Sequence, residues 1–153
     1  YNVNVDCTKY SVSPHIYNQE MINLYSKSDA FVYELLVGSL KKESIKKNNF
    51  IIKKINKYLN SKDKINILCF GDGIGSDSLN FTKSGYSVTY FDIEGKISDF
   101  ARLNFKLNKV DNLIQTIFKD SHLLENAYDV VICREVLEHL EDPFETVKKL
   151  RSY

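Results

Sequence analysis

The sequence predicts an α/β fold: a doubly wound, mainly parallel sheet with helices on both faces and an N-terminal helical extension. Three observations support this prediction. Apolar residues follow a helical spacing before residue 62, short apolar runs alternate with helical patterns after it, and glycines follow the first apolar run. Parallel strands need crossover connections, and right-handed crossovers place helices on both faces of a sheet. The expected organisation is a helical lead over residues 1–61 and a sheet domain over 62–153.

The lead predicts two or three amphipathic helices. Its apolar residues recur at three-to-four spacing from Ile22 to Leu40 and again from Ile45 to Leu59. The aromatic rings of this segment either form a lid over an acceptor or, as is commoner for large rings, are buried in the core and at interfaces. These side chains are Tyr10, His15, Tyr17, Tyr25, Phe31 and Tyr33.

Four strands are expected in the remainder of the chain. Short runs rich in β-branched and aromatic residues cover 65–70, 86–92, 114–120 and 128–133. A helical pattern over 97–107 separates the second run from the third. Asp142 followed by Pro143 predicts the start of a last helix over 144–151, because Asp caps helices and proline suits the first helical position.

Composition bounds the partners and the compartment. Lys and Arg total 21 and Asp and Glu total 20, so no overall field draws the chain onto nucleic acid or an anionic membrane, although a local basic patch stays open. The three cysteines lie far apart without a C-x-x-C pair, which favours reduced thiols over a disulfide framework or a zinc site. With no long apolar run and no signal-like N-terminus, we expect a cytoplasmic protein with no membrane partner.

A nucleoside-containing ligand is predicted where the first strand ends. Gly71, Gly73 and Gly75 lie between a predicted strand and a predicted helix, and glycine lets a ligand approach the main chain and the amides of the helix start. Asp92 ends the second strand, where a carboxylate can accept two hydrogen bonds from a ribose diol. A tight turn without a ligand is the alternative for the glycines, and a strand-terminal cap is the alternative for Asp92. Ser76 replaces the last glycine of a dinucleotide fingerprint, which disfavours a dinucleotide.

Four motifs in order resemble the Rossmann-like S-adenosylmethionine-dependent methyltransferases, over residues of about 64 to 151. They are Ile-Leu-Cys-Phe-Gly-Asp-Gly-Ile-Gly at 67–75, Val-Thr-Tyr-Phe-Asp-Ile at 88–93, Phe-Lys-Asp-Ser at 118–121 and Tyr-Asp-Val-Val-Ile-Cys-Arg-Glu-Val-Leu-Glu-His-Leu-Glu-Asp-Pro at 128–143. The fourth is most similar to small-molecule O-methyltransferases of the quinone-biosynthesis type. The resemblance therefore implies S-adenosylmethionine as cofactor and a small-molecule methyl acceptor.

Carried over by position, the resemblance implies a set of cofactor-binding residues. The glycines with Asp72 would shape the methionine and ribose pocket, and Asp92 with Ile93 would hold the ribose. Asp120 with Ser121 would contact adenine, and Cys133, Arg134 and Glu135 would border the methionine end. Cys69 departs from the family, which usually has Asp or Glu at this position. Either Asp72 takes over the role of that carboxylate, or the methionine ammonium is held less tightly.

Glu135, Glu138 and His139 form a second constellation, since the positions i, i+3 and i+4 share one face of a helix. His139 with Glu135 is the candidate catalytic pair, with His139 as a general base. The same three side chains are the candidate metal ligands, and the pattern resembles the metal site of methyltransferases that act on the 3′-terminal ribose of small RNAs. A solvated helix start is the third alternative, and no metal is assigned.

The chain ends just after the helix that should precede a fifth strand. The family resemblance implies seven strands with the fourth at the centre, so ending here leaves an apolar, unpaired edge. We therefore expect a missing C-terminal segment, or a partner such as a second copy of the chain, to complete the sheet.

The sequence leaves three functions open. The first is methyl transfer to an oxygen or nitrogen of a small molecule or sugar. The second is metal-dependent 2′-O-methylation of RNA, although nucleic acid is disfavoured by the charge balance. The third is a catalytically silent S-adenosylmethionine-binding module.

Overall fold

The computed structural model describes residues 3–9, 11–12, 19–59 and 63–153, and within these ranges it contains a single parallel sheet. The strands are β1 (Asn66–Phe70), β2 (Ser87–Phe91), β3 (Ile114–Ile117) and β4 (Val130–Cys133), in the order β3-β2-β1-β4. All three neighbouring pairs are parallel. The predicted fold class and the four strands are therefore confirmed.

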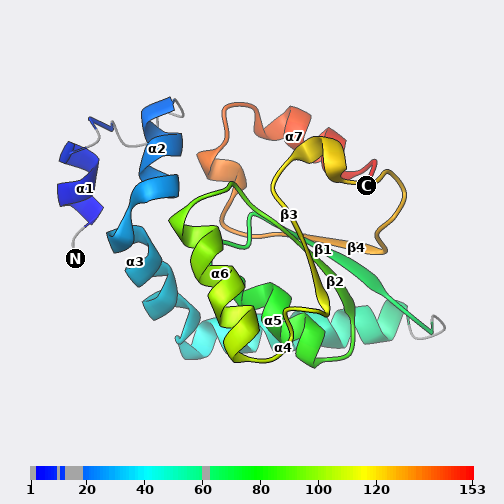
Figure 1. Cartoon of the computed structure of the whole chain (residues 1–153). Coiled ribbons are helices and arrows are strands. Elements are labelled where there is room, and N and C mark those ends of the chain that lie inside the picture. The colour runs from blue at the N-terminus through cyan, green and yellow to red at the C-terminus, as the bar shows by residue number, and fades with distance from the viewer. Residues whose placement is uncertain (1–2, 10, 13–18, 60–62) are drawn as a thin grey trace.

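Helices cover both faces of this sheet, as Figure 1 shows. On one face lie α4 (Lys42–Tyr58), α5 (Ser76–Lys83) and α6 (Lys96–Leu107), and on the other lies α7 (Pro143–Leu150). Ile55 of α4 and Phe81 of α5 pack with Ile67 of β1, whereas Leu150 packs with Leu68, which points to the opposite face. Adjacent strand residues thus serve different cores, as the two-residue period of a strand requires.

The third strand is shorter than the pattern over 114–120 predicts. β3 ends at Ile117, and Asp120–His122 forms a 3₁₀ turn, η1, in which His122 N donates to Lys119 O at 2.9 Å. The last helix begins as predicted: the side chain of Asp142 accepts a hydrogen bond from Glu145 N at 2.9 Å, and Pro143 occupies the first turn.

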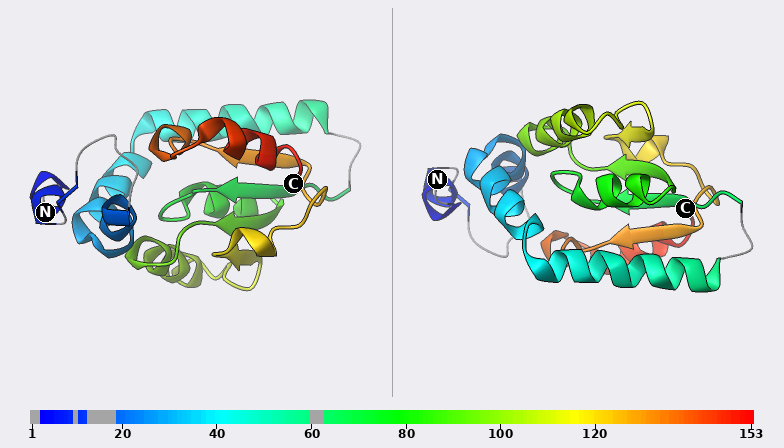
Figure 2. Two further views of the ribbon diagram at one scale, coloured as in Figure 1. Left: turned by 90° about the horizontal axis from the view of Figure 1, so that it is seen from above. Right: turned by 90° about the horizontal axis from the view of Figure 1, so that it is seen from below.

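The lead forms α1 (Val3–Lys9), α2 (Gln19–Lys27) and α3 (Asp29–Ser39) in addition to α4, and α1 was not expected from the periodicity. Figure 2 shows α2 and α3 beyond the carboxyl ends of the strands. Their contact with the sheet domain is close, because a Cβ atom on Gly95 would lie 2.5 Å from Ser26 O. The aromatic candidates Tyr10, His15 and Tyr17, and the boundary at 61/62, lie outside the described residues.

At the other side of the sheet, β4 is an edge strand. Within residues 63–153 it pairs with β1 alone, and β1 in turn separates it from β2. In the described ranges, no helix combines the length and the apolar character needed to cross a membrane.

Candidate active site

The glycine loop and Asp92 meet at the carboxyl ends of β1 and β2. Asp92 accepts hydrogen bonds from two backbone amides, Gly73 N at 2.6 Å and Ile93 N at 2.7 Å. The loop is anchored further by Gly71 N, which donates to Phe91 O at 2.7 Å. The structure therefore brings together the glycine loop and Asp92, the two features expected to bind one ligand.

Burial raises the pKa of Asp92 to about 6, although the two amide hydrogen bonds oppose this change. A carboxylate has roughly four lone-pair positions, and the amides use two of them. Asp92 thus retains the capacity to accept two hydroxyl groups. Ile93, the next residue, contributes one of the two amides that bind the Asp92 carboxylate.

All three loop glycines have positive φ: 69° at Gly71, 55° at Gly73 and 76° at Gly75. Each also lies against a side chain. A Cβ atom on Gly71 would be 2.5 Å from Val136, and one on Gly73 would be 3.1 Å from Leu35 of α3. The missing side chains at Gly71 and Gly73 therefore leave room for α3 and for the segment after β4, which cover the loop.

Asp72 has a different role from the one expected of a ligand contact. Its carboxylate accepts hydrogen bonds from Asp77 N at 3.0 Å and Ser78 N at 2.7 Å, at the start of α5. These two helix amides therefore bond to Asp72 rather than face a ligand, which corrects the expectation from the sequence. A carboxylate at a helix N-terminus is also favoured by the helix dipole.

A buried polar cluster that the sequence did not reveal lies beside the loop. The Arg134 guanidinium, directly after β4, donates to Asp77 at 2.9 and 3.1 Å and to the side-chain oxygen of Asn48 on α4. The ion pair is largely shielded from solvent. Asn48 occupies a core-facing position of α4, between Ile45 and Ile52, and a polar residue at such a position was the available signal. Arg134 thus links β4, α5 and α4.

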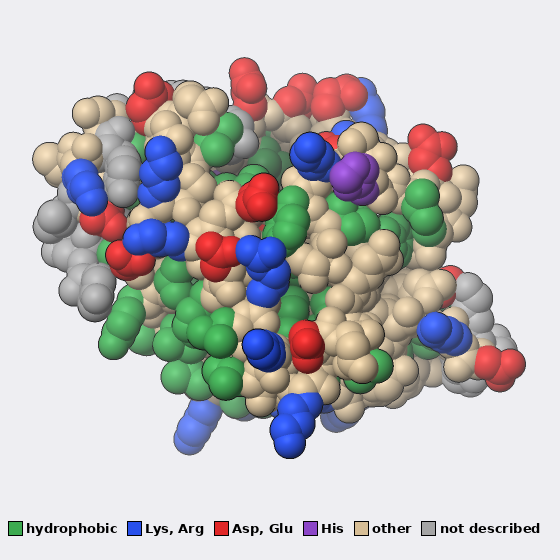
Figure 3. Space-filling model, viewed as in Figure 1, with side chains coloured by type: hydrophobic (Ala, Val, Ile, Leu, Met, Phe, Trp, Pro, Cys, Tyr) green, Lys and Arg blue, Asp and Glu red, His purple; other side chains and the backbone are tan. Residues whose placement is uncertain are grey.

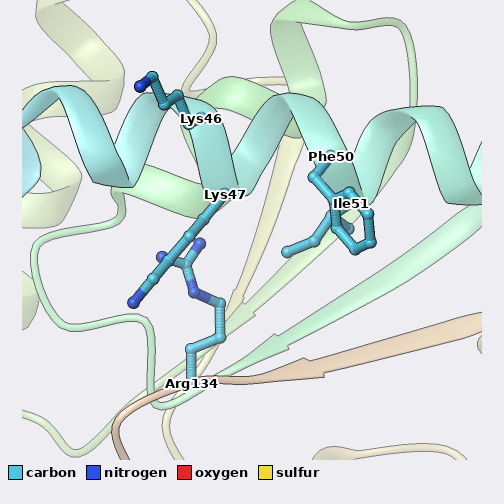
Figure 4. Close-up of a pocket in the computed structure, with 5 residues that line it drawn as sticks. All are labelled: Lys46, Lys47, Phe50, Ile51 and Arg134. Atoms are coloured by element: carbon cyan, nitrogen blue, oxygen red, sulfur yellow. The ribbon is translucent and has the colours of Figure 1, made fainter.

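The cavity at the loop has a volume of about 170 Å³. Cys69 forms part of its floor and is completely buried, and its pKa is raised by burial and by the nearby charge of Asp72. A shallower hollow of about 400 Å³ adjoins it, between α4 and the end of β4. Figure 4 shows this hollow: the side chains of Lys47 and Arg134 converge in it, and Phe50 and Ile51 lie next to them. Its remaining lining residue is Lys46.

The expected adenine contacts lie apart from this cavity. Asp120 and Ser121 are exposed, and Asp120 pairs with Lys149 of α7 at 2.6 Å. Asp120 lines a separate hollow at α7. Cys133 is half-buried, and its pKa is raised by burial and then by the charge of Glu138.

The expectation that Glu135, Glu138 and His139 share one helix face is wrong. Glu135 has φ 54° and lies outside any helix, and only the 3₁₀ turn η2 (Leu137–His139) follows it. Glu135 Oε1 lies 3.5 Å from Lys47 Nζ. The His139 ring instead lies edge-on to the ring of Tyr25, with 5.9 Å between the ring centroids. In the part of the chain that the structure describes, no three His, Cys, Asp or Glu side chains form a group that could hold a metal ion.

Two buried carboxyl groups make stability depend on pH. The pKa of Asp72 is raised to about 8 by burial and by the charge of Asp77, and that of Asp92 to about 6 by burial. Both titrate near 4 in an unfolded chain. Above pH 4 and up to these values the folded state binds more protons than the unfolded state, so its stability falls as pH rises.

We therefore expect a melting temperature lower at pH 8.5 than at pH 5.5, by on the order of 5 °C for a chain of this size. Scanning calorimetry at constant ionic strength measures it. In Asp72→Asn the profile should be flatter, since one of the two groups no longer titrates. A melting temperature that rises over this range, or an unchanged slope in the variant, would contradict the assignment.

Comparisons with known proteins show which family the chain belongs to. Residues 44–153 match the model of a methyltransferase domain. The chain belongs to this methyltransferase family. The resemblance to S-adenosylmethionine-dependent methyltransferases is thereby confirmed, and S-adenosylmethionine is the cofactor of the domain.

Relatives and solved structures agree with this membership. A ubiquinone biosynthesis O-methyltransferase of Rickettsia bellii is 34% identical over 99 residues, and one of Nitrosospira multiformis is 36% identical over 92 residues. These matches cover 61% and 59% of this chain, which spans only 39% and 37% of those enzymes.

Among solved structures, a protein of Methanococcus maripaludis described as an S-adenosylmethionine-dependent methyltransferase matches with a TM-score of 0.57 at 19% identity, over 67% of this chain and 48% of its own. The structure of WbdD matches with a TM-score of 0.59 at 18% identity, over 97% of this chain and 32% of its own. Both support the fold of the chain.

Proposed function

We propose that this chain is the cofactor-binding part of an enzyme that transfers the methyl group of S-adenosylmethionine to an oxygen of a small molecule. The observation that carries the proposal is the contact between Asp92 and the Gly73 amide at 2.6 Å, within a loop in which glycine occupies every second position. The O-methyltransferase names of the relatives favour oxygen over nitrogen. Sugars and amines remain the other acceptors that the motifs allow.

The residues present fit this cofactor. Asp92 has two lone-pair positions left for the ribose hydroxyls, and the main chain at Gly71 and Gly73, which lines the cavity, would face the sugar and the methionine chain. Asp120 and Ser121 would reach adenine only after the Asp120–Lys149 pair opens. Cys69 offers no carboxylate to the methionine ammonium, whereas Asp72 lines the cavity and keeps two lone-pair positions beside its two bonds to the amides of α5.

When bound, S-adenosylmethionine supplies an electrophilic methyl group on its sulfonium. The task of the chain is then alignment, because an in-line displacement depends on the angle and distance of the acceptor oxygen. Arg134 would fix the methionine end through its bonds to Asp77 and Asn48. Leu35 and Val136, which cover the loop, would exclude water from the methyl group.

His139 is the proposed general base that removes the proton of the acceptor. It belongs to the same short segment as Val136, which covers Gly71, and its ring contacts Tyr25 of the lead. Glu135, the other catalytic candidate, lines the cavity at the loop but is paired with Lys47. This ion pair is the observation that favours His139 over Glu135.

RNA methylation with a bound metal is a weaker proposal, because Glu135 lies off the turn that carries Glu138 and His139. A silent cofactor-binding module remains the non-enzymatic alternative, motivated by Cys69 and by the limited span of the relatives that the chain covers.

The test is methyl transfer by the full-length protein from S-adenosylmethionine with a radiolabelled methyl group. The acceptors are a catechol, a sugar, an amine and a short RNA. We expect transfer to one of the two small-molecule oxygen acceptors, the catechol or the sugar, and we expect this transfer to be unaffected by EDTA. Binding of the cofactor without turnover on any acceptor would favour the silent module, and EDTA-sensitive labelling of RNA would favour the metal-dependent enzyme.

His139→Gln should lower kcat by roughly 100-fold or more, as expected for loss of a general base, with little change in cofactor affinity. His122→Gln is the matched control, because His122 is likewise exposed in a 3₁₀ turn but lies after β3. Equal activity of the two variants would remove His139 from the mechanism.

A further inference from the structure

The outer face of α4 has a charge unlike that of the rest of the chain. Residues 41–58 hold seven of the 21 cationic residues and only one of the 20 acidic ones, Glu43. A compositional preference for lysine over arginine does not explain this scarcity of acids. All seven lysines are exposed: Lys41, Lys42, Lys46, Lys47, Lys53, Lys54 and Lys57. In Figure 3, blue side chains project along the lower edge, where Figure 1 places α4.

The charge is uncompensated at the centre of this face. Lys46, Lys53 and Lys57 follow helical spacing on the side opposite Ile55, and within the described ranges none of them makes an ion pair. Lys47 differs, because Glu135 lies 3.5 Å away. The outward stripe therefore presents free positive charge, whereas the hollow of Figure 4 is partly neutralised.

Apolar side chains are exposed on the same face. Phe50 is 60% exposed and Tyr58 is 68% exposed, and Lys54 and Lys57 lie over their rings at 5.2 and 5.4 Å. Leu40, just before the helix, is also exposed, whereas Ile45 lies on the flank of α4 that lines the loop cavity. The inner face is fixed in the core by Ile55, so that α4 presents this outer face rigidly.

We propose that α4 docks the protein on an anionic lipid surface. Lysines around exposed apolar side chains are the pattern of a helix that lies in the bilayer interface, where the ammonium groups meet phosphates and the apolar side chains enter the acyl boundary. The helix has 17 residues, and at about 1.5 Å per residue it offers a flat contact of roughly 25 Å.

Nucleic acid suits this surface less well. Lysine lacks the planar fork that binds phosphate with two hydrogen bonds, and the two exposed rings, Phe50 and Tyr58, have Lys54 and Lys57 over them rather than an open face for stacked bases. The even charge of the whole chain predicts neither partner; the inference depends on where the charges lie. It is independent of methyl transfer, because none of these lysines lines the loop cavity; Lys46 and Lys47 line only the shallower hollow beside it.

The test is co-sedimentation of the full-length protein with vesicles of phosphatidylcholine, with or without one third phosphatidylglycerol. We expect binding to the anionic vesicles alone and its loss at high salt, which screens surface charge. The triple variant Lys46→Gln, Lys53→Gln and Lys57→Gln should bind on the order of 100-fold more weakly, since each lysine near an anionic surface contributes roughly a factor of five. Phe50→Ser should weaken binding about tenfold.

The matched control is Lys27→Gln, Lys83→Gln and Lys106→Gln, which removes the same charge from exposed positions on α2, α5 and α6. It should bind like the unmodified protein, and circular dichroism should show that both triple variants are folded. Equal loss in the two variants, binding to neutral vesicles, or no binding to either vesicle would overturn the proposal. Tighter binding to a single-stranded RNA than to anionic vesicles would overturn it in favour of nucleic acid.

Discussion

Gly75→Ala is expected to lower the free energy of unfolding by about 2–5 kcal/mol, measured by urea denaturation. Two costs combine at this position. The φ of 76° is left-handed, which costs an L-residue roughly 1–2 kcal/mol. A Cβ atom would also lie 2.5 Å from two ring atoms of Phe105, whose side chain is fully buried and has little room to move.

Gly85→Ala separates these two costs. Gly85 has a φ of 91°, but a Cβ atom there would meet nothing within 4 Å. This variant should therefore lose only the conformational part, roughly 1–2 kcal/mol. Equal losses at the two glycines would mean that Phe105 does not resist a side chain at position 75.

Phe105→Leu in the Gly75→Ala background completes a double-mutant cycle. Removing the ring should relieve the clash, so the double variant should be more stable than the sum of the single effects predicts, by about 1–2 kcal/mol. Additive losses would show that the left-handed backbone alone carries the cost.

Much of the fold could be predicted because the local sequence pattern and the tertiary packing agree. Both faces of β1 are buried, so its apolar residues form a continuous run in the sequence. Asp142 and Pro143 mark the start of α7 through local capping alone, without contacts from other elements. The end of β3 was missed because Phe118 and Lys119 continue the strand pattern, while η1 is formed by a turn after them. α1 lacks a helical apolar period that sequence alone would detect.

The site could be predicted only where a residue type at a given position has a specific structural role. Glycines directly after a strand are such a signal, because their backbone here has positive φ. The carboxylate at the end of the next strand is a second one, because it binds the glycine loop. Asn48 and Asp77 were missed because their partner, Arg134, is distant in the sequence, and only the packing of α4 and α5 brings them together. Glu135 was misplaced because its left-handed backbone ends any helical register before Glu138.

Asp92→Ala should weaken binding of S-adenosylmethionine to the full-length protein by at least about 100-fold, measured by isothermal titration calorimetry. Each hydrogen bond to a charged group contributes roughly 1.5–3 kcal/mol, and the ribose would lose two of them. Glu94→Gln, an exposed carboxyl two residues further along, removes the same charge and should bind like the unmodified protein. Equal affinity of the two variants would exclude Asp92 from the cofactor site.

The pH dependence of cofactor affinity gives a second test of Asp92. Asp92 also holds Gly73 N, so Asp92→Ala could weaken binding by moving the loop alone. In the unmodified protein, however, the pKa of about 6 means that the carboxyl group takes up a proton below this pH and loses part of its capacity to accept hydroxyl groups. Affinity for the cofactor should therefore fall progressively from pH 7 to pH 5 in the unmodified protein and stay nearly level in Asp92→Asn. Parallel profiles in the two proteins would show that protonation of Asp92 does not affect binding of the cofactor.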